Sequence, residues 1–414
     1  MPNTAARKHA TVSMGFVTGM LSGMLRRNKN PAPLLDGLDK TYRLHKWLGI
    51  TGLVFAIIHW LWAQGTKWAV GWGWLTRPAR KPRATADSMG SIESALRGWR
   101  GLAEDLGEWA FYAVAVLLVL ALVKRFPYRL FAKTHHWMAA IYLVLAFHTL
   151  VLVQFSYWAQ PVGWALAMLL ASGTVSAVWV LLGRVGAQRT AHGVIESLQT
   201  YPALNVLETT LRMDPGWPGH RPGQFAFAMS NPKEGPHPYT LASAWVPEDR
   251  RITFITKALG DHTRRLPERL RVGDQVTVEG PYGCFTFDDE KARQIWIGAG
   301  IGITPFIARM KYLAQHKGQD ARPVDLFHPT SDVDPQAIEK LRADSQAAGV
   351  VLHLLIDKQN GRLTGERLRA MVPGWKDASV WFCGPTAFGR ALRADLLAQG
   401  LEPEAFHQEL FEMR

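Results

Sequence analysis

Hydrophobic residues are distributed unevenly along this chain. Between residues 47 and 183 long apolar stretches carry almost no charge, whereas from residue 184 onward charged residues, glycine and proline recur as in soluble domains. Four stretches are long enough to cross a bilayer once their flanks are included, namely residues 47–64, 109–123, 136–155 and 164–182. The pattern therefore predicts a membrane half followed by a soluble half.

A weaker apolar stretch at residues 11–25 precedes these four. It could be a secretory signal, but it ends in Arg26 and Arg27 rather than in a small-residue cleavage site, so we expect an uncleaved fifth span. The uncharged segment 156–163 is typical of an external loop, and the loop before residue 136 is marked as cytoplasmic by its basic residues, which are Lys124, Arg125, Arg129 and Lys133. Alternation then places the 66–107 loop outside, although it is also rich in basic residues.

Charge and cysteine content narrow the possible partners. The formal net charge is +13, but the basic residues cluster mostly beside the apolar segments, which favours an anionic lipid surface over nucleic acid. Only two cysteines occur, Cys284 and Cys383. They exclude a Cys-ligated iron–sulfur cluster, a Cys₄ zinc site and a disulfide framework within this chain.

Histidines recur inside two of the predicted spans, where an ionisable side chain is costly and usually has a partner. His45 and His59 are 14 positions apart, a rise of about 21 Å with both side chains on one face. His135 and His148 are 13 positions apart, a rise of about 19 Å. Because the two spans run in the same direction, His45 is expected level with His135, and His59 level with His148. Two such pairs can supply both axial ligands of two haem irons.

These histidines could also have a simpler role. Each could just hydrogen-bond a neighbouring helix, whereas zinc would require a different spacing and an oxygen or sulfur ligand nearby. Helical phase opposes the haem interpretation, because His148 lies about 140° around the helix from His135 and about 120° from His136. Local unwinding or a tilted helix is therefore expected in this span.

The soluble half changes its pattern near residue 290. Short alternating stretches between residues 204 and 278 predict a small antiparallel barrel, and strands then alternate with helices. Residues 294–297 lead into Gly298-Ala-Gly-Ile-Gly-Ile-Thr-Pro305 and a helical stretch at 306–315. Gly298, Gly300 and Gly302 would let the backbone approach a pyrophosphate, with Thr304 capping the helix and Pro305 in its first turn. This is not the GxGxxG dinucleotide pattern, so a purely structural turn is an alternative.

Six motifs together carry a resemblance to a known family. His237-Pro-Tyr-Thr240-Leu-Ala-Ser243 resembles the HPFT flavin motif of the NADPH oxidase and ferric reductase family. The same order and spacing are found in the paired histidines, Gly280-Pro-Tyr-Gly283, the glycine run, Cys383-Gly-Pro385 and Phe406-His-Gln-Glu-Leu-Phe411. The resemblance extends from about residue 40 to the end of the chain.

The resemblance implies a multidomain fold with three parts. A helical transmembrane di-haem bundle would occupy residues 1–190, an antiparallel β-barrel FAD domain 191–290, and an α/β Rossmann-like NAD(P)H domain 291–414. The implied cofactors are FAD, two haem b, and NADPH or NADH. The family usually has six spans where five are predicted here.

The resemblance also assigns residues. Those implied to bind FAD are His237, Pro238, Tyr239, Thr240, Ser243, Lys257, Gly260, Thr263, Gly280, Tyr282 and Gly283. Those implied to bind the nicotinamide nucleotide are Gly298, Gly300, Gly302, Thr304, Pro305, His328, Cys383, Gly384 and Pro385. Thr240 would lie near flavin N5, Cys383 would line the nicotinamide, and Phe411 would stack on the flavin, although Glu412-Met-Arg414 follow it. Cys383 as a small buried residue and Lys257 as a solvated charge are the plainer alternatives.

His328 departs from the family pattern. NADPH-specific relatives tend to have arginine there, so the choice between NADPH and NADH stays open. We expect discrimination for NADPH to be modest near neutral pH and to improve as His328 protonates.

The expected activity is transmembrane electron transfer in a bacterial inner membrane, with the soluble half cytoplasmic. Hydride passes from NAD(P)H to FAD, and single electrons then pass through an inner haem (His45, His135) and an outer haem (His59, His148). Dioxygen, giving superoxide, is the preferred acceptor, with a ferric chelate as its rival. An electron-donating subunit for a periplasmic partner or quinone is a different class, and a transporter or sensor without haem is a third.

Overall fold

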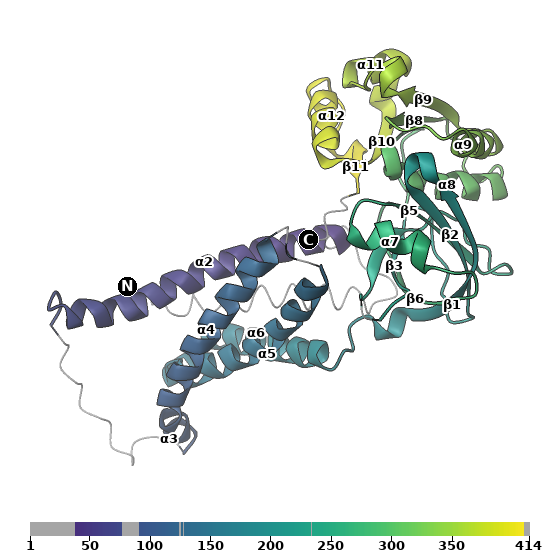
Figure 1. The fold of residues 1–414 in the computed structure, drawn as a ribbon. Helices are drawn as coiled ribbons and strands as arrows, with labels where there is room; N and C mark the ends of the chain where they lie inside the picture. Colours follow the sequence, from purple (N-terminus) through teal and green to yellow (C-terminus); the bar gives the residue numbers. More distant parts are fainter. Residues whose placement is uncertain (1–37, 77–90, 124–125, 127, 233, 410–414) are drawn as a thin grey trace. The chain divides into compact units, whose positions relative to one another are not determined.

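The computed structural model describes residues 38–409 apart from 77–90, 124–125, 127 and 233. The chain divides into two compact units, the first ending at Ala187 and the second beginning at Gln188. Figure 1 shows the first unit as helices and the second as two sheets with helices. Each unit is described by itself.

Four helices of the first unit are long and apolar enough to cross a membrane, and they are α2 (Leu38–Gly71), α4 (Arg100–Leu122), α5 (Tyr128–Leu152) and α6 (Pro161–Leu181). They coincide with the four predicted stretches, which are thereby confirmed by length and composition. Large apolar side chains face outward, as a lipid environment requires, including Trp62 and Trp109 at 71% and 73% exposed. The expected span at residues 11–25 lies outside the described residues.

Helix boundaries differ from the expected ones where charged residues continue a helix. α5 already begins at Tyr128, so Arg129 and Lys133 belong to the helix rather than to a loop. α4 begins at Arg100 and is preceded by α3 (Ser91–Gly98), which shortens the expected outer loop. Hydropathy locates only the apolar part of a span. The helix itself extends beyond that part, because its backbone hydrogen bonds do not depend on apolar side chains.

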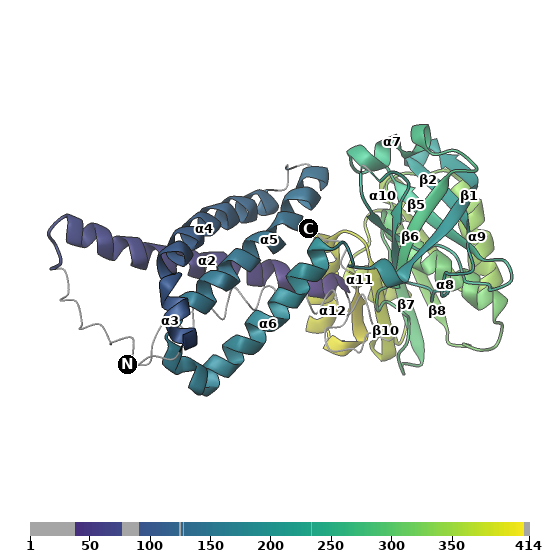
Figure 2. The same cartoon turned by 90° about the horizontal axis from the view of Figure 1, so that it is seen from below.

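Side-chain contacts fix the relative directions of three spans (Figure 2 shows the helices from below). Near the starts of their helices, His45 of α2 and His135 of α5 lie beside each other. Near their ends, Gln64 of α2 donates to Glu108 of α4 at 2.8 Å, and His148 of α5 bonds to the early part of α4. α2 and α5 therefore run in the same direction and α4 in the opposite one, as expected.

The first sheet of the second unit is antiparallel, with order β4-β3-β6-β1-β2-β5. Its strands are β1 (Thr190–Tyr201), β2 (Val206–Met213), β3 (Phe225–Met229), β4 (His237–Thr240), β5 (Arg251–Lys257) and β6 (Gln275–Tyr282). Among the described residues the edges meet only at the bridge between Leu241 and Phe254, so the sheet is antiparallel as predicted but the barrel is not closed. A strand as short as β4 cannot form a ladder along the whole of β5. Helix α7 (Asp261–Arg269) follows β5.

The second sheet is wholly parallel, with order β11-β10-β7-β8-β9. Its strands are β7 (Arg293–Gly298), β8 (Val324–Thr330), β9 (Val351–Ile356), β10 (Ala378–Cys383) and β11 (Phe406–Gln408). The helices are α8 (Thr304–Gln315), α9 (Pro335–Ala348), α10 (Asp357–Asn360), α11 (Gly365–Met371) and α12 (Thr386–Ala398). The strand order reverses between β7 and β10, which makes that point the topological switch of a Rossmann-like fold.

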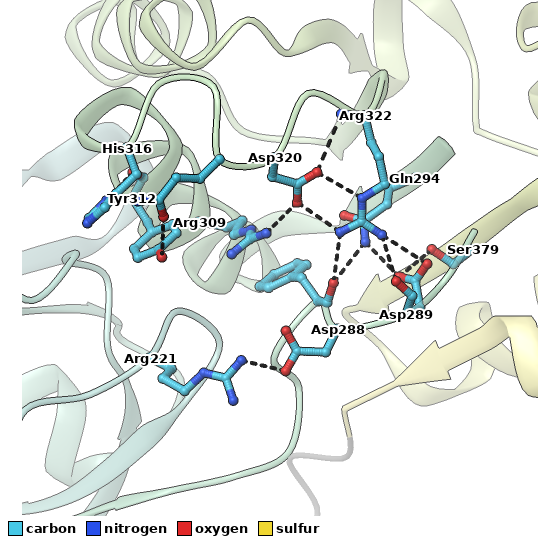
Figure 3. Close-up of polar contacts among 12 residues, drawn as sticks. Arg221, Asp288, Asp289, Gln294, Arg309, Tyr312, His316, Asp320, Arg322 and Ser379 are labelled. Carbon is cyan, nitrogen blue, oxygen red and sulfur yellow. Dashed lines mark hydrogen bonds and ion pairs between the residues drawn. The ribbon is translucent and has the colours of Figure 1, made fainter. Parts of the chain in front are cut away.

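A polar network anchors the beginning of this sheet (Figure 3). The Asp289 carboxylate accepts hydrogen bonds from Gln294 at 2.7 Å and Ser379 at 2.9 Å, which stand at the starts of β7 and β10. Arg322 pairs with Asp289 at 3.1 Å and with Asp320 at 2.8 Å. These ties hold the amino edge of the sheet, so the carboxyl edge is the one left for ligands.

Candidate functional site

Two predicted motifs meet at the switch point. The loop after β7 carries Gly300 and Gly302, and the turn after β10 begins at Cys383. The Ala299 N–H donates to the Cys383 carbonyl at 2.9 Å, and a Cβ at Gly302 would lie 2.2 Å from that oxygen. Gly300 has a φ of +56°, a conformation that glycine adopts without strain. The glycines therefore allow the two loops to touch, in the crevice where such folds bind ligands.

The helix after this loop begins differently from expectation. The N-cap of α8 is Ile303 and makes no side-chain cap, while the Thr304 hydroxyl donates to the Ile301 carbonyl at 2.8 Å. The predicted Thr304 cap is therefore wrong, because a 3₁₀ turn (Gly300–Ile303) tightens the entry. Pro305 lies in the first turn, as predicted. On the other loop, Pro385 is the N-cap of α12.

His328 joins the second strand to the same edge. Its Nδ1 donates to the Gly298 carbonyl at 2.6 Å, so this nitrogen ties β8 to the end of β7. Burial lowers the pKa of His328 below its ordinary value, and the hydrogen bond to Gly298 opposes that shift only in part. The imidazole is therefore neutral at neutral pH, so the expected gain in NADPH discrimination would need lower pH.

A pocket lies beside this edge, lined by residues of β2, β5, β8, α8 and α9. Ile255 and Ile301 contribute apolar surface, and Lys257 and His328 contribute polar groups. The Lys257 ammonium pairs with Asp332 at 3.0 Å, so it is an ion-pair partner within the pocket lining rather than a freely solvated charge. Of the residues predicted from the sequence to bind cofactors, Lys257, Gly300 and His328 therefore belong to one concave surface, as a nucleotide site requires.

The flavin motif on β4 is held by a chain of polar contacts. The His237 ring stacks on His262, with centroids 3.7 Å apart and planes 11° from parallel. His262 Nε2 bonds to the Tyr239 hydroxyl at 2.9 Å, while its Nδ1 bonds to Glu234, which also pairs with Arg269. Burial, and secondarily the neighbouring His262, lowers the pKa of His237 to about 4. His237 is therefore neutral at neutral pH.

These stacked histidines raise the question of a metal site. Ligand atoms of Glu234, His237 and His262 lie within 4.8 Å of one another. Metal-binding lone pairs lie in the plane of an imidazole. Because the two rings are nearly parallel and stacked, no single ion can lie in both planes. The group is a stacked hydrogen-bonding cluster in this arrangement.

Other flavin-motif residues shape the backbone around this cluster. The Thr263 hydroxyl accepts from the N–H groups of Leu259 at 3.0 Å and Gly260 at 3.1 Å, closing the turn before α7. The Ser243 hydroxyl accepts from the Thr253 N–H at 3.1 Å, which ties the segment after β4 to β5. Thr240 is buried at the end of β4.

The remaining sequence-derived residues also lie in this sheet or outside the described part. Pro238 pairs with Phe227 in the β3–β4 ladder, and Gly280 belongs to β6. Tyr282 donates to Glu279 at 2.6 Å, and Gly283 has a φ of +106°. Phe411 lies outside the described residues.

Cys383 is fully buried, and its neighbour Glu409 escaped the sequence analysis. Burial first, and the Glu409 carboxylate second, raise the pKa of the Cys383 thiol well above its ordinary value. Glu409 is buried and its N–H donates to the Phe382 carbonyl at 3.3 Å. Its position in the terminal motif was visible, but its burial depends on β11 pairing with β10. The other cysteine, Cys284, is exposed.

One pair of membrane histidines is juxtaposed. The rings of His45 and His135 have centroids 5.9 Å apart and planes at 85°. Two imidazoles on opposite sides of one metal ion, each with a bond of about 2 Å, would have centroids about 6 Å apart. The spacing therefore fits two axial ligands of one iron.

His148 is held by a different helix. Its Nδ1 donates to the Ala103 carbonyl of α4 at 2.7 Å, which leaves Nε2 as the nitrogen with the lone pair. His59 lies on α2 next to Trp60, whose ring stacks on Phe111 of α4. α5 is helical throughout Tyr128–Leu152, so of the two expected alternatives, local unwinding or a tilted helix, the unwinding is wrong. The phase difference instead turns His135 toward α2 and His148 toward α4.

Comparisons with known proteins agree with this division of the chain. Residues 11–146 match the family model of the ferric reductase like transmembrane component. A flavohemoprotein of Oceanobacillus iheyensis is 26% identical over 188 residues, covering 42% of this chain and 46% of that protein. The 2-halobenzoate 1,2-dioxygenase electron transfer component of Burkholderia cepacia is 24% identical over 217 residues, covering 50% of this chain and 63% of that protein. The chain thus spans about half the length of these curated relatives.

A solved structure also resembles the fold. The flavohemoglobin from Malassezia yamatoensis with bound FAD and heme has a TM-score of 0.50 at 17% identity, covering 98% of this chain and 95% of that one. Together these findings define a ferric reductase-like transmembrane domain followed by a ferredoxin reductase-like module. This combination is consistent with a flavocytochrome b of the NADPH oxidase and ferric reductase family, which is the resemblance that the motifs carry.

Proposed function

We propose that this protein is a transmembrane NAD(P)H oxidoreductase that moves electrons through FAD and two b-type haems to an acceptor across the membrane. The preferred acceptor is dioxygen, which would give superoxide. The protein would work in a bacterial inner membrane with its reductase module on the cytoplasmic side. The proposed domains are residues 1–190, 191–290 and 291–414.

The observation that carries the proposal is the His45–His135 pair. Their rings come from two spans and have the spacing that one iron requires, with centroids 5.9 Å apart. His45 and His135 would hold the inner haem, and His59 and His148 the outer one. When bound, a haem with two histidine ligands supplies one-electron transfer and has no open coordination position. The acceptor would then react at a haem edge.

The reductase module would deliver electrons from the nucleotide. FAD, when bound, supplies the exchange between two-electron and one-electron chemistry. Tyr239 and Thr240 would orient the flavin, with Tyr239 itself fixed by its 2.9 Å bond to His262. Gly300, where a Cβ would meet no described atom within 4 Å, would admit the nucleotide backbone. Cys383 would lie behind the nicotinamide as a fully buried, uncharged thiol, because its pKa is raised.

An electron-donating subunit is the second candidate. The relative from Burkholderia cepacia is named an electron transfer component, and with no open iron the chain could donate to a periplasmic protein or quinone. Lipid is a required partner in either case, because the four spanning helices expose large apolar side chains. Nucleic acid is not among the proposed partners.

One preparation of the purified protein tests both the haem content and the identity of the electron acceptor. The detergent-purified protein with FAD should show two bis-histidine haems per chain in reduced-minus-oxidised spectra. NAD(P)H oxidation should produce superoxide, and superoxide dismutase should abolish any accompanying ferric-chelate reduction. Iron reduction that resists the dismutase would make the ferric chelate the direct acceptor. A protein without haem would place the chain in the transporter or sensor class and refute the proposal.

A further inference from the structure

The His148 ring packs closely against helix α4. A Cβ built at Gly107 would lie 1.9 Å from His148 Nδ1, 2.4 Å from Cε1 and 2.6 Å from Cγ. Contacts this short with three ring atoms mean that the imidazole rests directly on the Gly107 backbone. Any side chain at position 107 would have to displace the ring rather than the end of a flexible chain.

The same turn of α4 also supplies the hydrogen-bond partner. His148 Nδ1 donates at 2.7 Å to the carbonyl of Ala103, four residues before Gly107. In an α-helix that carbonyl also accepts from the N–H of residue 107. The Ala103 carbonyl and the bare Gly107 backbone therefore form one continuous surface, which we call the His148 seat. Ala103 and Gly107 are both buried, as a fixed contact requires.

We infer that the His148 seat positions the axial ligand of the outer haem, and that Gly107 is a positioning residue for it. This inference rests on the proposed function, in which His148 is a ligand. A donor bond from Nδ1 to a backbone carbonyl fixes the tautomer, points Nε2 away from α4 and makes Nε2 a stronger ligand. The glycine allows the ring to come close enough for that bond.

The chain offers a matched control on the same helix. Gly101 also lies on α4, but a Cβ there meets nothing within 4 Å. Gly107→Ala, in the interior of α4, improves helix propensity by about 1 kcal/mol, and Gly101→Ala, in the first turn, changes it in the same direction by less. Only the Gly107→Ala side chain would collide with His148. A difference in haem binding between the two variants therefore measures the effect of the His148 seat.

The test measures haem per chain and the midpoint potentials of the purified variants. The Gly107→Ala protein should contain one haem per chain instead of two, or keep two with a shifted outer-haem potential. Its inner-haem spectrum should stay unchanged. Gly101→Ala should keep two haems with wild-type potentials. Two haems with wild-type potentials in Gly107→Ala would overturn the inference.

A second variant covers the case in which Gly107→Ala yields no haem-loaded protein. Removing the ring should relieve the collision, so Gly107→Ala combined with His148→Gly should recover one haem per chain, like His148→Gly alone. If the double variant still lacks the inner haem, the collision is not with His148 and the inference fails. If His148→Gly alone keeps both haems, the ligand assignment in the proposed function fails instead.

Discussion

We predict that nucleotide choice is decided at the pocket beside β8 and that NADH is used better than NADPH. Among the described residues that line this pocket there is no arginine, and Asp332 follows the second parallel strand, where an acidic group favours a ribose 2′-hydroxyl. Lys257 is already paired with Asp332 at 3.0 Å. A 2′-phosphate would therefore be repelled by the Asp332 carboxylate, and the Lys257 ammonium that could attract it is already paired.

The size of the effect follows from Coulomb's law. One carboxylate about 4 Å from a phosphate charge costs about 1 kcal/mol in water and about 4 kcal/mol at the effective dielectric near a protein surface. Asp332 keeps 45% of its side-chain surface exposed, so the lower value applies. Asp332→Asn should then raise kcat/KM for NADPH about fivefold, because it removes the repulsion and releases Lys257. It should lower kcat/KM for NADH, because the carboxylate that favours the ribose 2′-hydroxyl is lost.

Steady-state kinetics with both nucleotides measure this prediction. Asp249→Asn is the control, since Asp249 is an exposed aspartate paired with Arg251 in the other sheet. The preference for NADH should weaken as ionic strength rises, and His328→Arg should shift it toward NADPH. A wild-type preference for NADPH would refute the reasoning, and one of about a thousandfold, worth about 4 kcal/mol, would mean that another group holds the 2′-phosphate.

Three further predictions concern other parts of the chain. His59→Leu should remove only the outer haem and leave NAD(P)H able to reduce the inner one, whereas His136→Leu should keep two haems per chain; loss of a haem in His136→Leu would mean that the inner pair is misassigned. Phe411→Ala should change the KM for the nucleotide and turnover without altering either haem spectrum, and unchanged kinetics would reduce Phe411 to a packing residue. Burial lowers the pKa of His220 to about 4 despite its hydrogen bond to the Ser243 carbonyl. The unfolded chain then binds the proton first, so His220 alone should contribute a fall of about 3 kcal/mol in the free energy of unfolding as pH drops from about 6.5 to about 4, in the same direction as His237. A flat thermal-unfolding profile over that range would contradict the shift.

The membrane half was predictable because lipid imposes long uninterrupted apolar helices, and hydropathy detects them directly. What hydropathy could not give was where a helix ends once it leaves the apolar region, as Arg129 and Lys133 in α5 show. Helical phase indicated that His135 and His148 face different sides of one helix. It could not indicate that the two side chains contact different helices. His135 lies beside His45 of α2, and His148 bonds to α4.

In the reductase module the motifs located the loops, and their meeting at the switch point follows from strand order. Contacts between distant segments were not predictable. The His262–Tyr239 bond joins residues 23 positions apart, and Glu409 is buried beside Cys383 only because β11 pairs with β10. The barrel is not closed because β4 (His237–Thr240) is too short to pair along the whole of β5, and the sequence pattern did not indicate that length.

The contrast between the two cysteines gives the protein a natural site for a single chemical label. Cys383 is fully buried with a raised thiol pKa, so little thiolate forms there, whereas Cys284 is exposed. A maleimide spin label or fluorophore should therefore attach at Cys284 alone in the folded wild-type chain. Since Cys284 directly follows the Gly280–Gly283 motif, such a probe would report from beside the proposed flavin site without any engineered substitution. Its distance to a second probe, on a cysteine introduced into the membrane half, would measure how the two units sit during turnover.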